Sequence, residues 1–100
     1  MQNTADTTER AERAIATQNE GSTYSRMVLH KAQDNLALVI TEEQNQDDTW
    51  APTVATLYEV DKHSGQRGTI GRQIATLIKK DCDPETFGVF AAALLEIATR

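Results

Sequence analysis

The chain has 100 residues, of which 39% are apolar, and a formal net charge of -5. This is the size of one domain with a modest core, and the acidity argues against binding nucleic acid or a membrane surface through the molecule as a whole. The longest apolar run, Gly88 to Leu95, is too short to span a bilayer. With no apolar leader and a single cysteine, Cys82, we expect a cytoplasmic protein without an internal disulfide.

The N-terminal segment is poor in material for a core. Ile15 is the only large aliphatic residue in the first 22 positions. A short helix over about Thr7 to Gln18 is one expectation and a disordered leader is the other, because so little apolar surface cannot offset the entropy of ordering the chain. We therefore expect a polar leader over residues 1–22 and a single globular domain over residues 23–100.

Three segments in the middle of the chain have the composition of strands. They are "YSRMVLHK" (residues 24–31), "LALVITEE" (residues 36–43) and "TVATLYEVD" (residues 53–61). In the second segment Leu36, Leu38 and Ile40 alternate with Ala37, Val39 and Thr41. A period of two predicts antiparallel strands, with a turn at Asp34 and Asn35. A long helix is the alternative because apolar residues also recur every four positions, but the β-branched run opposes it.

The C-terminal third has the apolar spacing of helices. Ile70, Ile74, Leu77 and Ile78 share one sector of a helical wheel, which predicts an amphipathic helix from Ile70 to Lys80. Asp83 and Pro84 have the pattern of an N-cap and a first-turn proline, so a second helix is expected from Pro84 to about Thr99. The predicted fold is α+β, a small antiparallel sheet of about three strands covered on one face by these two helices; an all-α fold is the alternative.

The segment "HSGQRGTIGR" (residues 63–72) stands out by its glycines and its charge. Five basic residues and no acidic residue lie between Lys62 and Lys80, whereas the other 81 residues carry a net charge of -10. One interpretation is a plain connection whose glycines adopt positive φ. A second is a basic contact face, and a third is an anion site at the start of the expected helix. The candidate residues are Arg67, Arg72, Lys79 and Lys80. The glycine spacing matches neither the Walker pattern nor the dinucleotide pattern.

An acidic stretch precedes the third expected strand. Its carboxylates are Glu42, Glu43, Asp47 and Asp48, and Trp50 follows them. The stretch has no central glycine and no closing glutamate, so it does not match a calcium loop. It is interpreted either as a solvated loop or as an acidic contact surface that stands in for phosphates. Trp50 is interpreted as the edge of the core or as an exposed anchor.

Nothing in the chain has the spacing of a catalytic or metal-binding set. Cys82 lies between two aspartates that disfavour a thiolate, and the two histidines have no partner at metal spacing. We therefore expect no cofactor, no metal and no enzymatic activity. The leading hypothesis is a protein-binding module that acts through the basic helix face and the acidic loop. The alternatives are an inhibitor or immunity-type protein that blocks a nucleic-acid-handling complex, and a small nucleic-acid-binding regulator.

Association is also expected, because a sheet covered on one face leaves its other face open. The apolar residues Ala37 and Val39 on that second face are one candidate seam. The helix face with Val89, Ala92 and Ala93 is the other. A homodimer or a complex with a protein partner follows from either seam.

Overall fold

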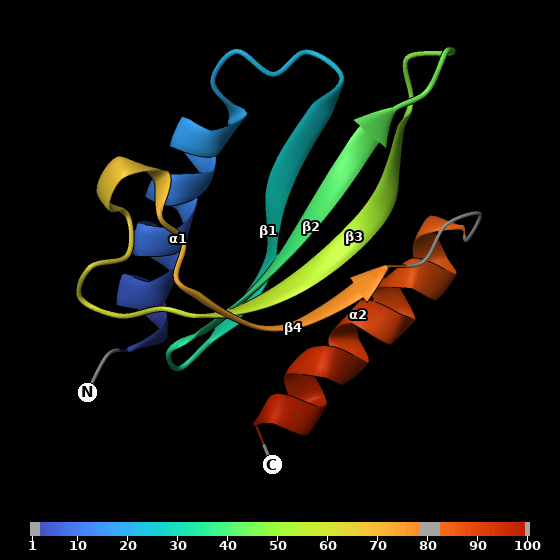
Figure 1. Ribbon diagram of the computed structural model, residues 1–100. Coiled ribbons are helices and arrows are strands. Elements are labelled where there is room, and N and C mark those ends of the chain that lie inside the picture. The colour runs from blue at the N-terminus through green and yellow to red at the C-terminus, as the bar shows by residue number, and fades with distance from the viewer. Residues whose placement is uncertain (1–2, 79–82, 100) are drawn as a thin grey trace.

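A computed structural model of the chain describes residues 3–78 and 83–99. The elements are, in chain order, α1 (Thr4–Asn19), β1 (Ser25–Gln33), β2 (Leu36–Gln44), β3 (Trp50–Glu59), the 3₁₀ turn η1 (Gln66–Gly68), β4 (Arg72–Ile78) and α2 (Pro84–Ala98). The four strands form one antiparallel sheet in the order β1-β2-β3-β4 (Figure 1). The predicted α+β class is confirmed, and the all-α alternative is wrong. Neither described helix has the length and apolar character needed to span a bilayer.

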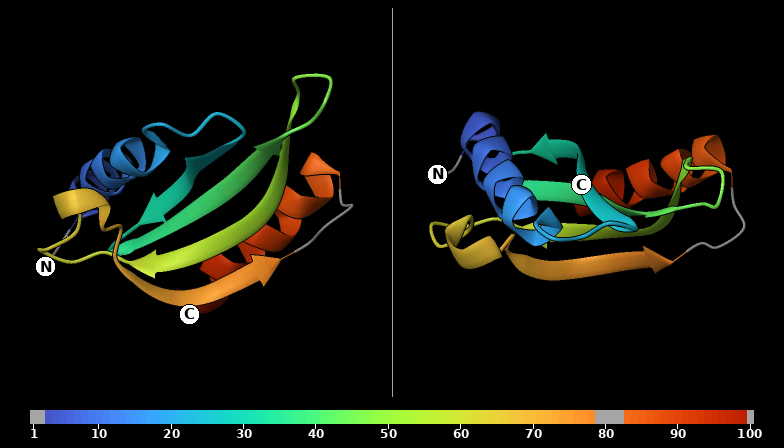
Figure 2. Two further views of the ribbon diagram at one scale, coloured as in Figure 1. Left: turned by 45° about the horizontal axis from the view of Figure 1, so that its top comes forward. Right: turned by 90° about the horizontal axis from the view of Figure 1, so that it is seen from above.

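The period of two in β2 determines which helix covers which face of the sheet. Leu36, Leu38 and Ile40 pack in one cluster with α2, together with residues of β3 and β4. Ala37 and Val39 point to the other face, where α1 lies. The left view of Figure 2 shows the two helices on opposite sides of the twisted sheet. Each face is covered only in part, because α1 contacts β1 and β2 whereas α2 contacts β2, β3 and β4.

Three expectations about this part of the chain are wrong. Where a helix was expected from Ile70 to Lys80, residues Arg72–Ile78 form the strand β4, and Lys79 and Lys80 lie outside the described residues. The expectation of two C-terminal helices on one face is also wrong, because the two helices are the N-terminal α1 and the C-terminal α2, and they lie on opposite faces. The seam expected at Ala37 and Val39 is not open either, since both side chains are buried beneath α1. The second C-terminal helix is confirmed, with Asp83 as its N-cap.

Helix α1 docks through small apolar residues and through polar side chains. Ala11, Ala14 and Ile15 are buried against the sheet, and the two alanines let the helix backbone approach it closely. The Thr7 hydroxyl donates to the Asp34 carbonyl oxygen in the β1–β2 turn. Near the other end, Gln18 donates to the Gly68 carbonyl oxygen at 2.8 Å. The helix is therefore tied to the chain at both ends.

A side chain of α1 caps the outer edge of β1 at Met27. Asn19 Oδ1 accepts a hydrogen bond from the Met27 backbone N–H at 2.8 Å, and Asn19 Nδ2 donates to the Met27 carbonyl oxygen at 2.9 Å. The amide thus makes the two hydrogen bonds that a residue of a neighbouring strand would make. Unpaired edges invite pairing with other chains, so this contact hinders pairing at this point of the edge.

Replacing Asn19 by alanine is expected to lower the free energy of unfolding by about 1–3 kcal/mol, because both Met27 backbone groups lose their partner in a partly buried place. Urea denaturation monitored by circular dichroism measures the change. Gln46→Ala, at an exposed hairpin position, is the control and is expected to cost less than about 0.5 kcal/mol. Equal midpoints for the two variants would show that the Asn19 contact contributes nothing.

Candidate functional site

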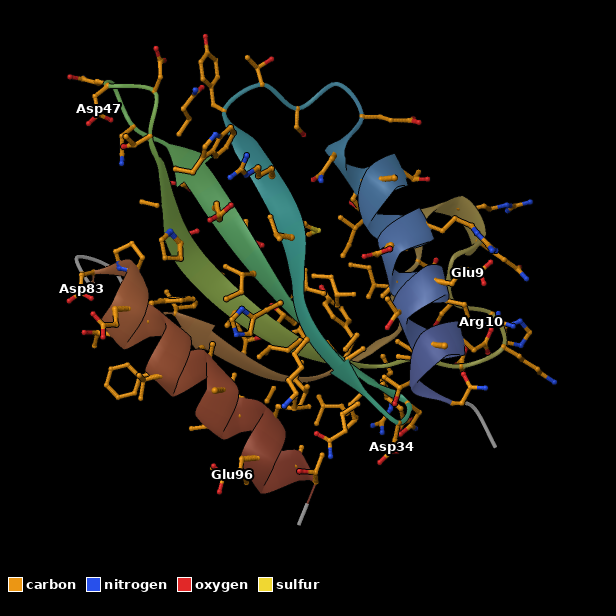
Figure 3. All side chains as sticks on the ribbon, turned by 180° about the vertical axis from the view of Figure 1, so that it is seen from behind. Glu9, Arg10, Asp34, Asp47, Asp83 and Glu96 are labelled. Atoms are coloured by element: carbon orange, nitrogen blue, oxygen red, sulfur yellow. The ribbon has the colours of Figure 1, made fainter. Side chains whose placement is uncertain are left out.

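The acidic residues singled out in the sequence lie at one end of the sheet, on the β2–β3 hairpin. Glu43, Asp47 and Asp48 are exposed there. The Thr49 hydroxyl and the Thr49 backbone N–H both donate to Asp47, and these hydrogen bonds hold the pKa of that carboxyl below its usual value. Glu42 is more enclosed and forms an ion pair with Arg26 at 2.8 Å. Figure 3 shows Asp47 at the tip of the hairpin.

The two described residues of the expected basic face, Arg67 and Arg72, do not lie on an α-helix. Arg67 is exposed in η1, and Arg72 begins β4, where its guanidinium pairs with Glu59 at 3.3 Å. Because β4 replaces the expected helix, no α-helix begins near Thr69, and the anion site that was expected at its first amides is not formed. Glu59 faces Leu36 at the end of the β2–β3 ladder opposite Trp50. Arg67 and Arg72 are thus separated from the acidic hairpin by the length of the sheet (Figure 1).

The glycines of the 63–72 segment let the chain lie tightly against its neighbours. Gly65 and Gly68 have positive φ, and a Cβ atom at either position would come within 3.3 Å of α1. Arg10 of α1 donates to the Lys62 carbonyl oxygen at 2.9 Å, across the same contact. The interpretation as a connection with positive-φ glycines is confirmed, although the connection joins two strands instead of a strand and a helix.

A cleft that the sequence analysis did not predict lies between β1 and α2, on the sheet face that α2 covers only in part. It consists of two adjoining cavities of about 190 and 260 Å³ that share His30. Ile40 and Phe87 line the smaller cavity, and Leu38 and Leu95 line the larger one. The floor is therefore the α2 side of the hydrophobic core. Figure 3 shows this side of the molecule, with α2 running beside the sheet and Glu96 near the end of the helix.

Trp50 closes the hairpin end of the cleft. It is half-buried and lies opposite Gln44 at the last pair of the β2–β3 ladder. The Arg26 guanidinium lies 4.2 Å from the centre of the indole ring and also pairs with Glu42. The three side chains come from three different strands and stack on one face, which fixes the shape of this end of the cleft.

The structure brings Glu42 and Trp50 together, places Glu43, Asp47 and Asp48 on the same hairpin, and leaves Arg67 and Arg72 at a distance. Sequence reasoning missed Val28, His30 and Pro52 as lining residues. The signal for Val28 and His30 was the alternation within β1, where Met27 and Leu29 face α1 whereas Val28 and His30 face the cleft. Pro52 lies on β3, and no pattern marked it. No cluster of three or more possible metal ligands occurs among the described residues.

Comparisons with protein-family models, with curated proteins and with solved structures found no match to this chain. The function proposed below therefore rests on the geometry of the described residues.

Proposed function

We propose that this protein is a non-enzymatic protein-binding module whose cleft between β1 and α2 accepts an apolar segment of a partner protein. The observation that carries the proposal is the cleft itself. Residues of the hydrophobic core are accessible in it beside β1, whereas α1 covers the other face of the same strand. Apolar clefts with a few polar groups at the rim are the usual form of a binding site. Val28 forms part of the wall and is accessible in the free protein.

The charges around the cleft indicate the chemistry of the partner. Glu43, Asp47 and Asp48 lie on the hairpin next to the Trp50 end, and the hydrogen bonds from Thr49 lower the pKa of Asp47. A partner segment with basic residues next to its apolar residues fits this arrangement. Such charges at the rim of an interface mainly raise the association rate. Arg67 and Arg72 lie at the other end of the sheet and have no part in this surface.

An inhibitor of a nucleic-acid-handling protein is the second candidate function. It is favoured by the hairpin, whose exposed carboxylates are ordered by the Thr49 hydrogen bonds and could occupy a site for phosphates. The two candidates differ in what they require. Binding of an apolar segment requires the cleft, whereas phosphate mimicry requires the hairpin carboxylates and leaves the cleft empty.

Val28→Lys is expected to abolish binding of the partner, because it places a long charged side chain across the apolar wall of the cleft. Val89→Lys is the matched control, since Val89 is 66% exposed on α2 and does not line the cleft. Quantitative mass spectrometry after affinity capture on the tagged parent and variants measures the effect. Proteins that depend on the cleft are lost with the first variant and retained with the second.

The double variant Asp47→Lys and Asp48→Lys separates the two candidate functions. A partner of the cleft should bind this variant more slowly, with a difference that high salt removes. A phosphate-mimicking inhibitor should lose its target completely with this variant and keep it with Val28→Lys. If Val28→Lys captures the same proteins as the parent at the same level, the cleft is not the binding surface.

A further inference from the structure

The two edges of the sheet differ in how they end. At β1 the Asn19 amide occupies the Met27 backbone groups, and α1 lies along the strand. At the other edge, β4 contacts β3 and α2 but no further described helix or strand. The outward backbone groups of β4 therefore have no strand or helix beyond them in the part of the chain that the structure describes. An edge of this kind is a template for pairing with another strand.

The residues of β4 favour such pairing. From Gln73 to Ile78 the chain carries no charge and is rich in β-branched residues, which suit strands. Arg72, the one charged residue of the strand, is already paired with Glu59. Ile74 is the extra residue of a bulge, because Leu57 pairs with Ala75 and Tyr58 pairs with Gln73. Beyond this bulge the strand continues in regular register to Ile78.

Exposed apolar side chains gather around this edge. Seven large apolar side chains are exposed among the described residues, and four of them lie on β4 or on the adjacent side of α2. Ile78 is 63% exposed on the strand, and Ile97 is 65% exposed on the helix. Ala92 and Leu95 face the cleft, so helical geometry turns Ile97 toward the β4 side. The apolar surface thus continues from the strand onto the helix.

We propose that β4 pairs with β4 of a second copy of this chain, antiparallel about a two-fold axis at Thr76. In this register Ala75 lies opposite Leu77 of the second copy, and these two residues face the same side of the sheet in each copy. Ile74, the bulge residue, and Ile78 lie at the two ends of this paired part, and both are exposed in the single chain. Thr76 lies opposite itself, which is a favourable cross-strand pair. No charged residue lies opposite another within the paired part.

A second copy of the chain fits this edge because it supplies an uncharged strand edge and an apolar helix side that match those of the first copy. A two-fold axis normal to the sheet puts both α2 helices on the same face of the joined sheet. The result is a continuous eight-stranded sheet. Since β1 is at the opposite edge, the cleft of each copy stays open, and the pairing is independent of the proposed function.

Sedimentation equilibrium of the parent and of three variants tests the pairing. The parent is expected to be a dimer at micromolar protein concentration. Added salt is expected to lower the dissociation constant of the dimer, because both copies carry a charge of -5 and salt screens their repulsion. Thr76→Lys places two lysines directly opposite each other and is expected to raise the dissociation constant at least about tenfold, which is about 1.4 kcal/mol. Thr76→Val keeps a β-branched pair at the axis, so the dissociation constant stays the same or falls. Val89→Lys, away from the seam, leaves it unchanged.

Several outcomes would overturn the proposal. The proposal is wrong if the parent is monomeric at all concentrations. It is also wrong if Thr76→Lys weakens the dimer no more than Val89→Lys does, or no more than Thr76→Val does. Hydrogen exchange on the parent supplies a readout that needs no variant: amides of β4 should exchange more slowly at high protein concentration, whereas the Met27 amide should not change.

Discussion

Gly71→Ala is expected to lower the free energy of unfolding by at least about 3 kcal/mol. Gly71 joins η1 to β4 with a φ of 157°, and a Cβ atom there would lie 2.2 Å from the Glu59 carbonyl oxygen. The obstructing atoms belong to the backbone at the end of β3, so they cannot rotate away as a flexible side chain would. The methyl group fits only if the β3–β4 pairing opens at the end where Glu59 pairs with Arg72. Urea denaturation of the purified variant measures the loss.

Gly88→Ala is the matched control, because the same methyl group is added in a helix where nothing lies within 4 Å of the new atom. Alanine has the higher helix propensity, so this variant is expected to gain up to about 1 kcal/mol. Opposite signs for the two substitutions are the expected result. If Gly71→Ala is as stable as the parent, the close contact with Glu59 does not constrain the fold.

The strands β1 to β3 could be predicted because local pattern and tertiary environment agree there. Leu36, Leu38 and Ile40 alternate with Ala37 and Val39, and each set is buried by a different helix. A sequence that alternates in this way is consistent with a strand between two packed layers, and the β-branched residues add to the preference. The sequence predicted one covered face and one open face. The second face is covered because α1 packs on it, and this packing was not expected of the polar N-terminal segment.

The strand β4 could not be assigned from its own residues, because its apolar positions fit two periods. Ile70, Ile74 and Leu77 share a helical sector, but in the fold they serve different neighbours: Ile70 packs with α1, and Leu77 packs with α2. The bulge at Ile74 hides the period of two in the sequence. Pairing with β3 decides the conformation, and that pairing is a tertiary effect that a helical wheel does not contain.

The packing of α1 was underestimated because small residues carry it. Ala11 and Ala14 are fully buried, yet a count of large aliphatic residues finds only Ile15. The remaining stabilisation comes from polar contacts with distant loops, such as the Thr7 and Gln18 hydrogen bonds. The cleft escaped prediction for a related reason, since it exists only because α2 covers three of the four strands.

Phe87→Ala is expected to destabilise α2 more than any other part of the fold. Phe87 is 1% exposed and packs with Leu38 and Leu57 beneath the helix, where truncation to alanine costs about 3–5 kcal/mol. Ala91 and Leu95 are the other buried residues of this helix, so little else holds it on the sheet. The helix should therefore open at lower free energy than the strands. Hydrogen exchange resolved by residue measures this as a selective loss of protection in α2.

Phe90→Ala tests whether burial causes this loss, because it makes the same change at a position that is 42% exposed. Its cost should be clearly smaller, since less apolar surface leaves water on folding at Phe90 than at Phe87. The functional consequence follows from the same geometry. Phe87 lines the cleft and α2 forms one of its walls, so Phe87→Ala should lose the partners that Val28→Lys loses. Equal protection of α2 in both variants would show that Phe87 does not anchor the helix, and retained partner binding would show that the cleft does not require it.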